Sequence, residues 1–232
     1  MFDTAYAAEC FRELLKGVPA TINITILSVL LGLIVGYLFA FFRIKKVPLL
    51  RTIVSLLVSL IRSTPILVQL YVVSYGLPRI IAFVHSDPTL VSKVSIVPMR
   101  TAVITFTIYA AAYFSEIYRA AYYGIEDGQL EAARSLSLPE PVVLFRIIVP
   151  QAVGSVIPNL SNSVIDILKN TSLVYTISVM DIMAKAAVVA SIRFKYIEVY
   201  VDALLIYLLL GIAFMLFFAV IEKILGKRKF CR

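Results

Sequence analysis

Histidine and cysteine are nearly absent from this 232-residue chain. The single histidine, His85, and the two cysteines, Cys10 and Cys231, exclude a zinc site or a disulfide framework, because either needs several such residues at close spacing. We expect free thiols and an exposed histidine in a loop. No G-x-x-x-x-G-K-[ST] sequence and no Ser/His/Asp constellation occurs, so nucleotide binding and hydrolytic catalysis are also unsupported. The chain is therefore predicted not to be an enzyme, with no catalytic residue and no metal ligand.

Charge is scarce as well. Charged residues make up 16% of the chain and hydrophobic residues 61%, with a mean hydropathy of +0.94, whereas a soluble domain carries about 25% charged residues. A lipid bilayer solvates such a composition better than a water-exposed fold can. The net charge of +8 comes from basic residues that lie between apolar runs, which is typical of membrane topology signals rather than of nucleic-acid binding.

Five apolar segments predict membrane spans. Ala20 to Phe42 contains 23 residues without a charge, enough to cross a hydrocarbon core of about 30 Å. Its Gly32 and Gly36 have the small-xxx-small spacing that allows close helix packing. The other segments are 49–81, which we expect to be bent or broken at Arg62-Ser63-Thr64-Pro65 and to emerge near Pro78 and Arg79, then 101–117, about 151–168, and 201–221.

The predicted fold is an all-α, polytopic helical membrane protein with about five transmembrane helices. Residues 1–19 form an extracytoplasmic or interfacial N-terminal segment, residues 20–222 the membrane domain, and residues 223–232 a basic cytoplasmic tail. The segment 173–190 contains Asp181 and Lys185, which favours an interfacial or re-entrant helix over a full span. Arg43, Lys45, Lys46 and Arg51 follow the first span without an acid among them. This places the N-terminus outside and the C-terminus in the cytoplasm.

The longest hydrophilic stretch precedes the fourth span. Leu130 to Leu136 predicts a short helix, Ser137-Leu138 a turn, and Pro139 the first position of a second helix that stops at Pro150. The predicted result is a pair of cytoplasmic helices, a helix-turn-helix that is polar enough for water and apolar enough to dock on a partner.

The segment EAARSLSLPEPVVLFRIIVP, residues 131–150, resembles the EAA loop of binding-protein-dependent ABC importer permeases. Glu131, Ala132, Ala133, Ile147 and Pro150 match the pattern at the expected spacing. Ser137 stands where that pattern has glycine, and a positive φ there would cost serine about 1 kcal/mol; Val149 replaces leucine.

Further segments resemble the polar amino acid permeases, which include histidine-, glutamine-, arginine- and cystine-type members. IRSTPILVQL, residues 61–70, is similar to their IRGTPLLVQL segment, with Ser63 for glycine. The segment 193–207 resembles cystine-type members, so cystine is one candidate substrate. The chain is thus identified as a member of the type I ABC importer permeases.

This resemblance implies a transporter in the bacterial cytoplasmic membrane, built with a second permease subunit and supplied by an extracytoplasmic substrate-binding protein. ATP-binding subunits would hold ATP and Mg, and this chain would hold no cofactor. The coupling loop, residues 120–150, would dock on the ATPase through Gly128, Glu131, Ala132, Ala133, Leu136 and Leu138.

Polar residues at membrane depth are candidate substrate contacts. They are Arg62, Thr64, Gln69, Ser161, Asn162, Asp166 and Lys169. Arg62 or Lys169 could meet the carboxylate of an amino acid and Asp166 its ammonium group. Alternatively Asp166 and Lys169, three residues apart, pair with each other. The alternative function is a stand-alone secondary transporter or channel that works without an ATPase.

Overall fold

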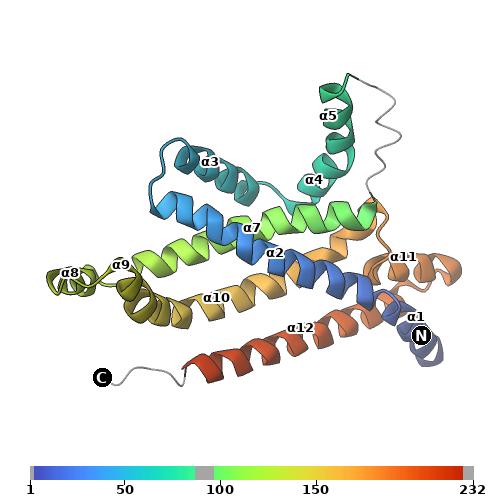
Figure 1. Ribbon diagram of the computed structural model, residues 1–232. Helices are drawn as coiled ribbons and strands as arrows, with labels where there is room; N and C mark the ends of the chain where they lie inside the picture. The colour runs from blue at the N-terminus through green and yellow to red at the C-terminus, as the bar shows by residue number, and fades with distance from the viewer. Residues whose placement is uncertain (1–2, 87–96, 227–232) are drawn as a thin grey trace.

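The computed structural model describes residues 3–86 and 97–226, and over these ranges the chain forms helices and no strand (Figure 1). The elements, in chain order, are α1 (Thr4–Leu15), α2 (Val18–Ile44), α3 (Leu50–Ser63), α4 (Ile66–Tyr71), the π-helical turn η1 (Val72–Gly76), α5 (Leu77–Val84), α7 (Pro98–Tyr123), α8 (Asp127–Ser135), α9 (Glu140–Val142), the π-helical η2 (Val143–Ile148), α10 (Val149–Asn170), the 3₁₀-helical η3 (Thr171–Ile177), α11 (Ile182–Arg193) and α12 (Tyr196–Gly226). The all-α prediction is confirmed.

The closest packing in the bundle joins α2 to α7, which run side by side (Figure 1). A Cβ atom built on Gly32 would lie 2.6 Å from the Ala110 Cβ, and one built on Gly36 would lie 2.9 Å from the Ala111 carbonyl oxygen. Both glycines therefore allow a backbone approach that a side chain would prevent. Phe106 and Phe114 of α7 are fully buried in the same core.

Three described helical segments are long and apolar enough to cross a membrane: Val18–Ile44, Ile66–Val84 and Tyr196–Ile224. A fourth is reached if 146–177 and Ile182–Arg193, which meet at a bend of 54°, count as one span. Helix α7 has 26 residues and packs alongside α2, but it is not among these segments. The number of five spans stays a prediction.

The second apolar segment is broken where predicted. Helix α3 ends at Ser63, Thr64 and Pro65 are extended, and α4 begins at Ile66. The expectation that the segment emerges near Pro78 and Arg79 is wrong, because Pro78 occupies the first turn of α5, where its missing N–H costs nothing, and the helix continues to Val84. His85 ends that helix and is exposed.

At the other end of the bundle α1 packs against α11 and α12 (Figure 1). The Lys195 ammonium lies 2.6 Å from an Asp3 carboxylate oxygen, and this hydrogen bond, together with the Tyr6 backbone N–H, lowers the Asp3 pKa. Cys10 is buried here as a free thiol, whereas Cys231 lies outside the described residues. Helix α11 has 12 residues, or about 18 Å, which is too short to span a bilayer.

One predicted boundary is wrong. The second helix of the 120–150 loop does not stop at Pro150, because α9 and η2 lead directly into α10, where Pro150 is tolerated in the first turn. Helix α12 runs to Gly226, so the segment 223–232 begins as helix, and its last six residues lie outside the described range.

Replacing Gly36 with alanine should lower the stability of the folded chain. The new methyl group would meet the Ala111 backbone, and we expect a loss of about 1–3 kcal/mol in the free energy of unfolding. Thermal unfolding in detergent measures it. The control is Gly211→Ala in α12, where a new Cβ has no neighbour within 4 Å, so helix propensity should leave stability unchanged or slightly higher. Equal melting temperatures of the Gly36→Ala and Gly211→Ala variants would contradict the packing role of Gly36.

Candidate functional site

The loop between α7 and α10 has a small apolar core of its own. Ile125, Ala133, Val143 and Ile148 are buried together, with Tyr122 and Ile147 packed against them. Helix α8 begins at Asp127, three residues before its predicted start, and α9 begins at Glu140, directly after Pro139. The two helices are thus held as one unit at one end of the bundle (Figure 1).

Most residues predicted to dock on an ATPase lie on the exposed surface of this unit. Gly128, Glu131 and Ala132 are exposed, and Leu136 and Leu138 are 73% and 36% exposed. Ala133 is the exception, because it is 3% exposed and faces the core of the loop. The surface therefore combines small residues, one acid and two uncovered leucines, and no other described element of the chain covers it.

The turn after α8 has a left-handed backbone at Ser137, the position where the family pattern has glycine. Ser137 has a φ of 52°, and the Leu138 N–H donates to the Ala133 carbonyl at 3.2 Å to close the helix. A glycine would adopt this conformation without steric cost.

A hydrogen bond that the sequence did not suggest ties this loop to α10. The Gln151 side-chain amide donates to the Gln129 side-chain oxygen at 2.7 Å. The two residues are 22 positions apart and belong to different helices, so no sequence pattern could have paired them. The bond is the direct side-chain link between α8 and the membrane helix that follows.

One face of α10 is a polar stripe, which we define as Gln151, Ser155, Asn159, Asn162, Asp166 and Lys169. These residues recur every three or four positions and all are exposed. Three of them, Asn162, Asp166 and Lys169, were predicted as substrate contacts; Ser161 is partly covered and lies beside the stripe. Gln151, Ser155 and Asn159 were missed, although their helical spacing was readable in the sequence.

The two charged residues of the stripe, Asp166 and Lys169, are exposed. Asp166 and Lys169 do not form an ion pair, so the alternative that they pair with each other is not seen in this structure. Towards the loop, Gln151, Ser155 and Asn159 line a cavity of about 280 Å³ against the end of α7. An exposed polar face at membrane depth requires water, a ligand or another protein chain against it.

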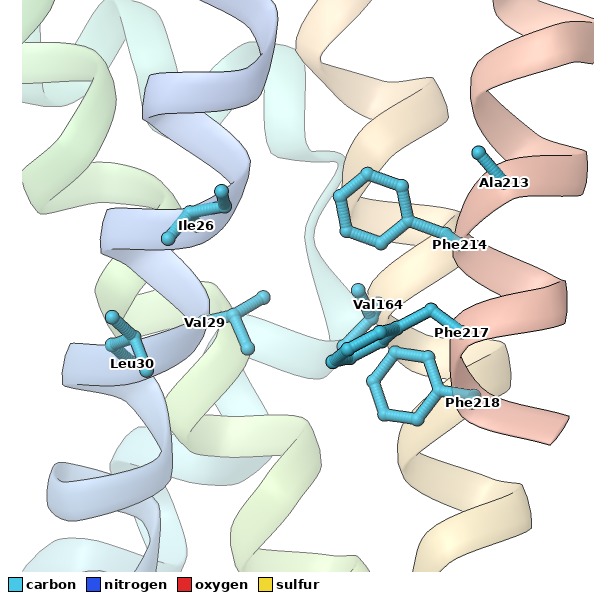
Figure 2. A pocket seen from close by; sticks show the side chains of 8 residues that line it. All are labelled: Ile26, Val29, Leu30, Val164, Ala213, Phe214, Phe217 and Phe218. Carbon is cyan, nitrogen blue, oxygen red and sulfur yellow. The ribbon is translucent and has the colours of Figure 1, made fainter. Parts of the chain in front are cut away.

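The opposite face of α10 is apolar. Val164 forms the floor of a groove of about 400 Å³ between α2 and α12, shown in Figure 2. Its other walls are Ile26, Val29, Leu30, Ala213, Phe214, Phe217 and Phe218. None of these side chains offers a hydrogen bond, so this groove does not suit a polar ligand.

Two of the predicted substrate contacts, Thr64 and Gln69, form hydrogen bonds within the protein at the α3–α4 break. The Gln69 side-chain nitrogen lies 2.8 Å from the Ile61 carbonyl and 3.0 Å from the Thr64 carbonyl. The Thr64 hydroxyl donates to the Leu60 carbonyl at 3.0 Å. These bonds satisfy backbone groups that the break leaves without helical partners.

Arg62 belongs to an ionic cluster around Glu116 of α7. Its guanidinium lies 3.7 Å from the Glu116 carboxylate and stacks 5.5 Å from the Tyr113 ring centre. Arg43 of α2, with a side chain only 9% exposed, binds the same carboxylate, and Arg119 lies 3.6 Å from it. The cluster joins α2, α3 and α7. Among the described residues, no three His, Cys, Asp or Glu side chains gather as metal ligands would.

Comparison with known proteins places this architecture in a defined class of membrane protein. Residues 28–228 match the family described as "Binding-protein-dependent transport system inner membrane component". The chain belongs to this family.

Individual relatives cover nearly the whole chain. The probable amino-acid ABC transporter permease protein PatM of Vibrio harveyi is 37% identical over 89% of this chain and 88% of its own length. The L-cystine transport system permease protein TcyL of Bacillus subtilis is 34% identical over 98% of this chain and 93% of its own.

Solved structures share the fold. The crystal structure of an amino acid ABC transporter with histidines matches with a TM-score of 0.84 and 26% identity, covering 96% of this chain and 99% of that one. A chain of the inward-facing MetNI methionine ABC transporter matches with a TM-score of 0.71 at 19% identity, covering 91% and 95%.

Replacing Ser137 with glycine should stabilise the turn after α8. Removing the side chain relieves a left-handed conformation, and we expect a gain of about 1 kcal/mol in the local opening free energy of the loop. Ser137→Val should have the opposite effect, because a β-branched residue is strained at this φ. Hydrogen exchange at the Leu136 and Leu138 amides reports both changes, and exchange that is the same in all three chains would contradict the strain.

Replacing Glu116 with glutamine should destabilise the fold, because Arg43 would lose its carboxylate while remaining largely buried. We expect about 2 kcal/mol, less than for a fully buried pair since Glu116 is 26% exposed. The control is Glu9→Gln, whose partner Arg193 is 3.9 Å away and whose side chain is 68% exposed; its cost should stay below about 1 kcal/mol. Thermal unfolding of the two variants tests the difference.

Proposed function

We propose that this chain is the permease subunit of an ATP-driven importer that moves a polar amino acid across the cytoplasmic membrane. A partner ATPase binds ATP and Mg and supplies the energy, and a substrate-binding protein delivers the amino acid from outside. The observation that carries the proposal is the exposed surface of α8, which the apolar core of the loop holds at one end of the bundle and which the rest of the described chain leaves uncovered. Such a surface suits docking on a separate protein.

The orientation follows from charge. Helix α2 ends at the same end of the bundle as α8 (Figure 1), and the segment 43–51 at its end contains Arg43, Lys45, Lys46 and Arg51 but no Asp or Glu. The rule that basic loops stay in the cytoplasm supports an orientation with α8 inside and the N-terminus outside. This is the side on which ATP is available.

The polar stripe of α10 supplies one wall of the substrate pathway. It offers a carboxylate at Asp166, an ammonium at Lys169 and neutral hydrogen-bonding groups along the remaining turns. A zwitterionic amino acid needs both charges matched, and these two charges form no ion pair with any residue that the structure describes. Thr64 and Gln69 bond to backbone carbonyls at the α3–α4 break and Arg62 contacts Glu116, so we give the stripe the leading role.

A second permease subunit completes the pathway. Helix α5 stands away from the bundle (Figure 1), and its Phe83 and Val84 are 85% and 70% exposed. An exposed apolar arm and an exposed polar stripe in one chain suit an interface in which two copies, or two related chains, enclose a polar channel. The L-cystine permease among the relatives makes cystine one candidate substrate.

The charge-reversal variant Glu131→Lys tests the coupling role. In vesicles that contain the permease, its ATPase and its binding protein, uptake of radiolabelled cystine, glutamine, histidine or arginine should be ATP-dependent. The variant should reduce that uptake at least tenfold, because a reversed charge on the docking surface opposes association. Glu222→Lys, an exposed residue near the end of α12, is the matched control and should transport normally.

Two outcomes would overturn the proposal. Normal uptake by the Glu131→Lys chain would remove the coupling role from α8. Uptake driven by an ion gradient without any ATPase would identify a secondary transporter instead.

A further inference from the structure

The turn between α2 and α3 carries cations without a carboxylate partner. Lys45, Lys46 and Arg51 are exposed, and none of them takes part in an ion pair with another described residue. The neighbouring Arg43 already binds Glu116, a carboxylate that two further arginines share. We call Lys45, Lys46 and Arg51 the basic corner. Its positive charge is not neutralised within the described chain.

An uncovered apolar face of α3 begins directly at this corner. Leu49, Ile53, Leu56 and Leu60 recur every three or four residues and are 74%, 50%, 67% and 61% exposed. The helix is held from a different side, where Val54, Val58 and Ile61 are buried against α2 and α7. The apolar face is therefore not needed for packing within the chain, and it is continuous with the basic corner.

The corner lies at the boundary between the bilayer and water. It follows Ile44, the last residue of the span formed by α2. From Leu49 to Leu60 the helix rises about 16 Å, close to half of a hydrocarbon core of about 30 Å. The apolar face is therefore about as long as a single leaflet is deep, and the basic corner lies at the start of that face.

We propose that the basic corner binds the headgroup of an anionic phospholipid, whose acyl chain lies along the exposed face of α3. A phospholipid such as phosphatidylglycerol combines a negative headgroup and an apolar tail over the same depth. Basic residues next to a span attract anionic lipid, and this geometry adds a surface for the tail. The inference requires only that α2 spans the membrane and does not depend on the transport proposal.

A lipid fits this surface better than a protein partner. The exposed face is aliphatic throughout and lies beside a membrane span, where lipid is the surrounding solvent. The surface proposed for the ATPase is on α8, and that proposed for a second subunit includes α5 and the polar stripe of α10. The basic corner belongs to neither.

The test compares lipid binding to the full-length chain and to the triple variant Lys45→Gln/Lys46→Gln/Arg51→Gln. Native mass spectrometry of the chain in neutral detergent measures binding of dioleoyl phosphatidylglycerol and of dioleoyl phosphatidylcholine. The unmodified chain should prefer phosphatidylglycerol. The triple variant should lose affinity for it roughly a hundredfold, at about fivefold for each removed charge, while phosphatidylcholine binding stays the same.

A second triple variant, Lys16→Gln/Arg79→Gln/Lys223→Gln, removes the same total charge from exposed positions elsewhere. It should bind phosphatidylglycerol like the unmodified chain. Equal losses in both triple variants, or equal binding of the two lipids by the unmodified chain, would overturn the proposal. Competition by inorganic phosphate at the lipid's own concentration would also overturn it, because the acyl chain would then contribute nothing.

Protein occupants are separated by two further measurements. If the basic-corner variant converts a dimer into a monomer in mass photometry, the corner is a subunit interface and the lipid proposal fails. If adding the ATPase displaces phosphatidylglycerol from the unmodified chain, the corner belongs to the ATPase contact and the proposal also fails. Circular dichroism and retained phosphatidylcholine binding show that each variant is folded.

Discussion

The fold depends on one constraint: polar groups at membrane depth must be satisfied by the protein, because the bilayer offers them no hydrogen bonds. The break between α3 and α4 shows how this is done. Ending a helix inside the membrane releases carbonyl groups at its last turn, and the side chains of Gln69 and Thr64 bind three of them. A broken span without these two side chains would be costly, so their chemistry permits the bend that separates α3 from α4.

The same constraint explains the contrast between the two faces of α10. Val164 faces the apolar groove shown in Figure 2, whereas the two charges of the polar stripe on the other face form no ion pair with any described residue. Charges that could have been satisfied internally, such as those of Arg43 and Glu116, are paired. Asp166 and Lys169 differ from those two residues because they are exposed and form no ion pair with a described residue, and this difference is the reason to propose them as ligand contacts.

The elements that follow local rules were predictable from the sequence. An uncharged run such as 20–42 specifies a spanning helix by length alone, and Pro65 specifies a break because it has no N–H to donate. Pro78 and Pro150 misled the boundaries, since a proline in the first turn begins a helix as readily as it ends one. The α8 surface followed from the resemblance, and the burial of Ala133 did not, because it depends on contacts with Val143 and Ile148. The Glu116 cluster and the Gln129–Gln151 bond join distant positions, for which a single sequence carries no signal.

The bond between Gln129 and Gln151 has a consequence for how movement passes through the protein. Breaking a hydrogen bond between two neutral amides at an exposed site costs a net of about 1 kcal/mol, because water then bonds to both groups. Separating an ion pair such as that of Arg43 with Glu116 would cost considerably more. The contact between α8 and α10 is therefore cheaper to open than the Glu116 cluster that joins α2, α3 and α7.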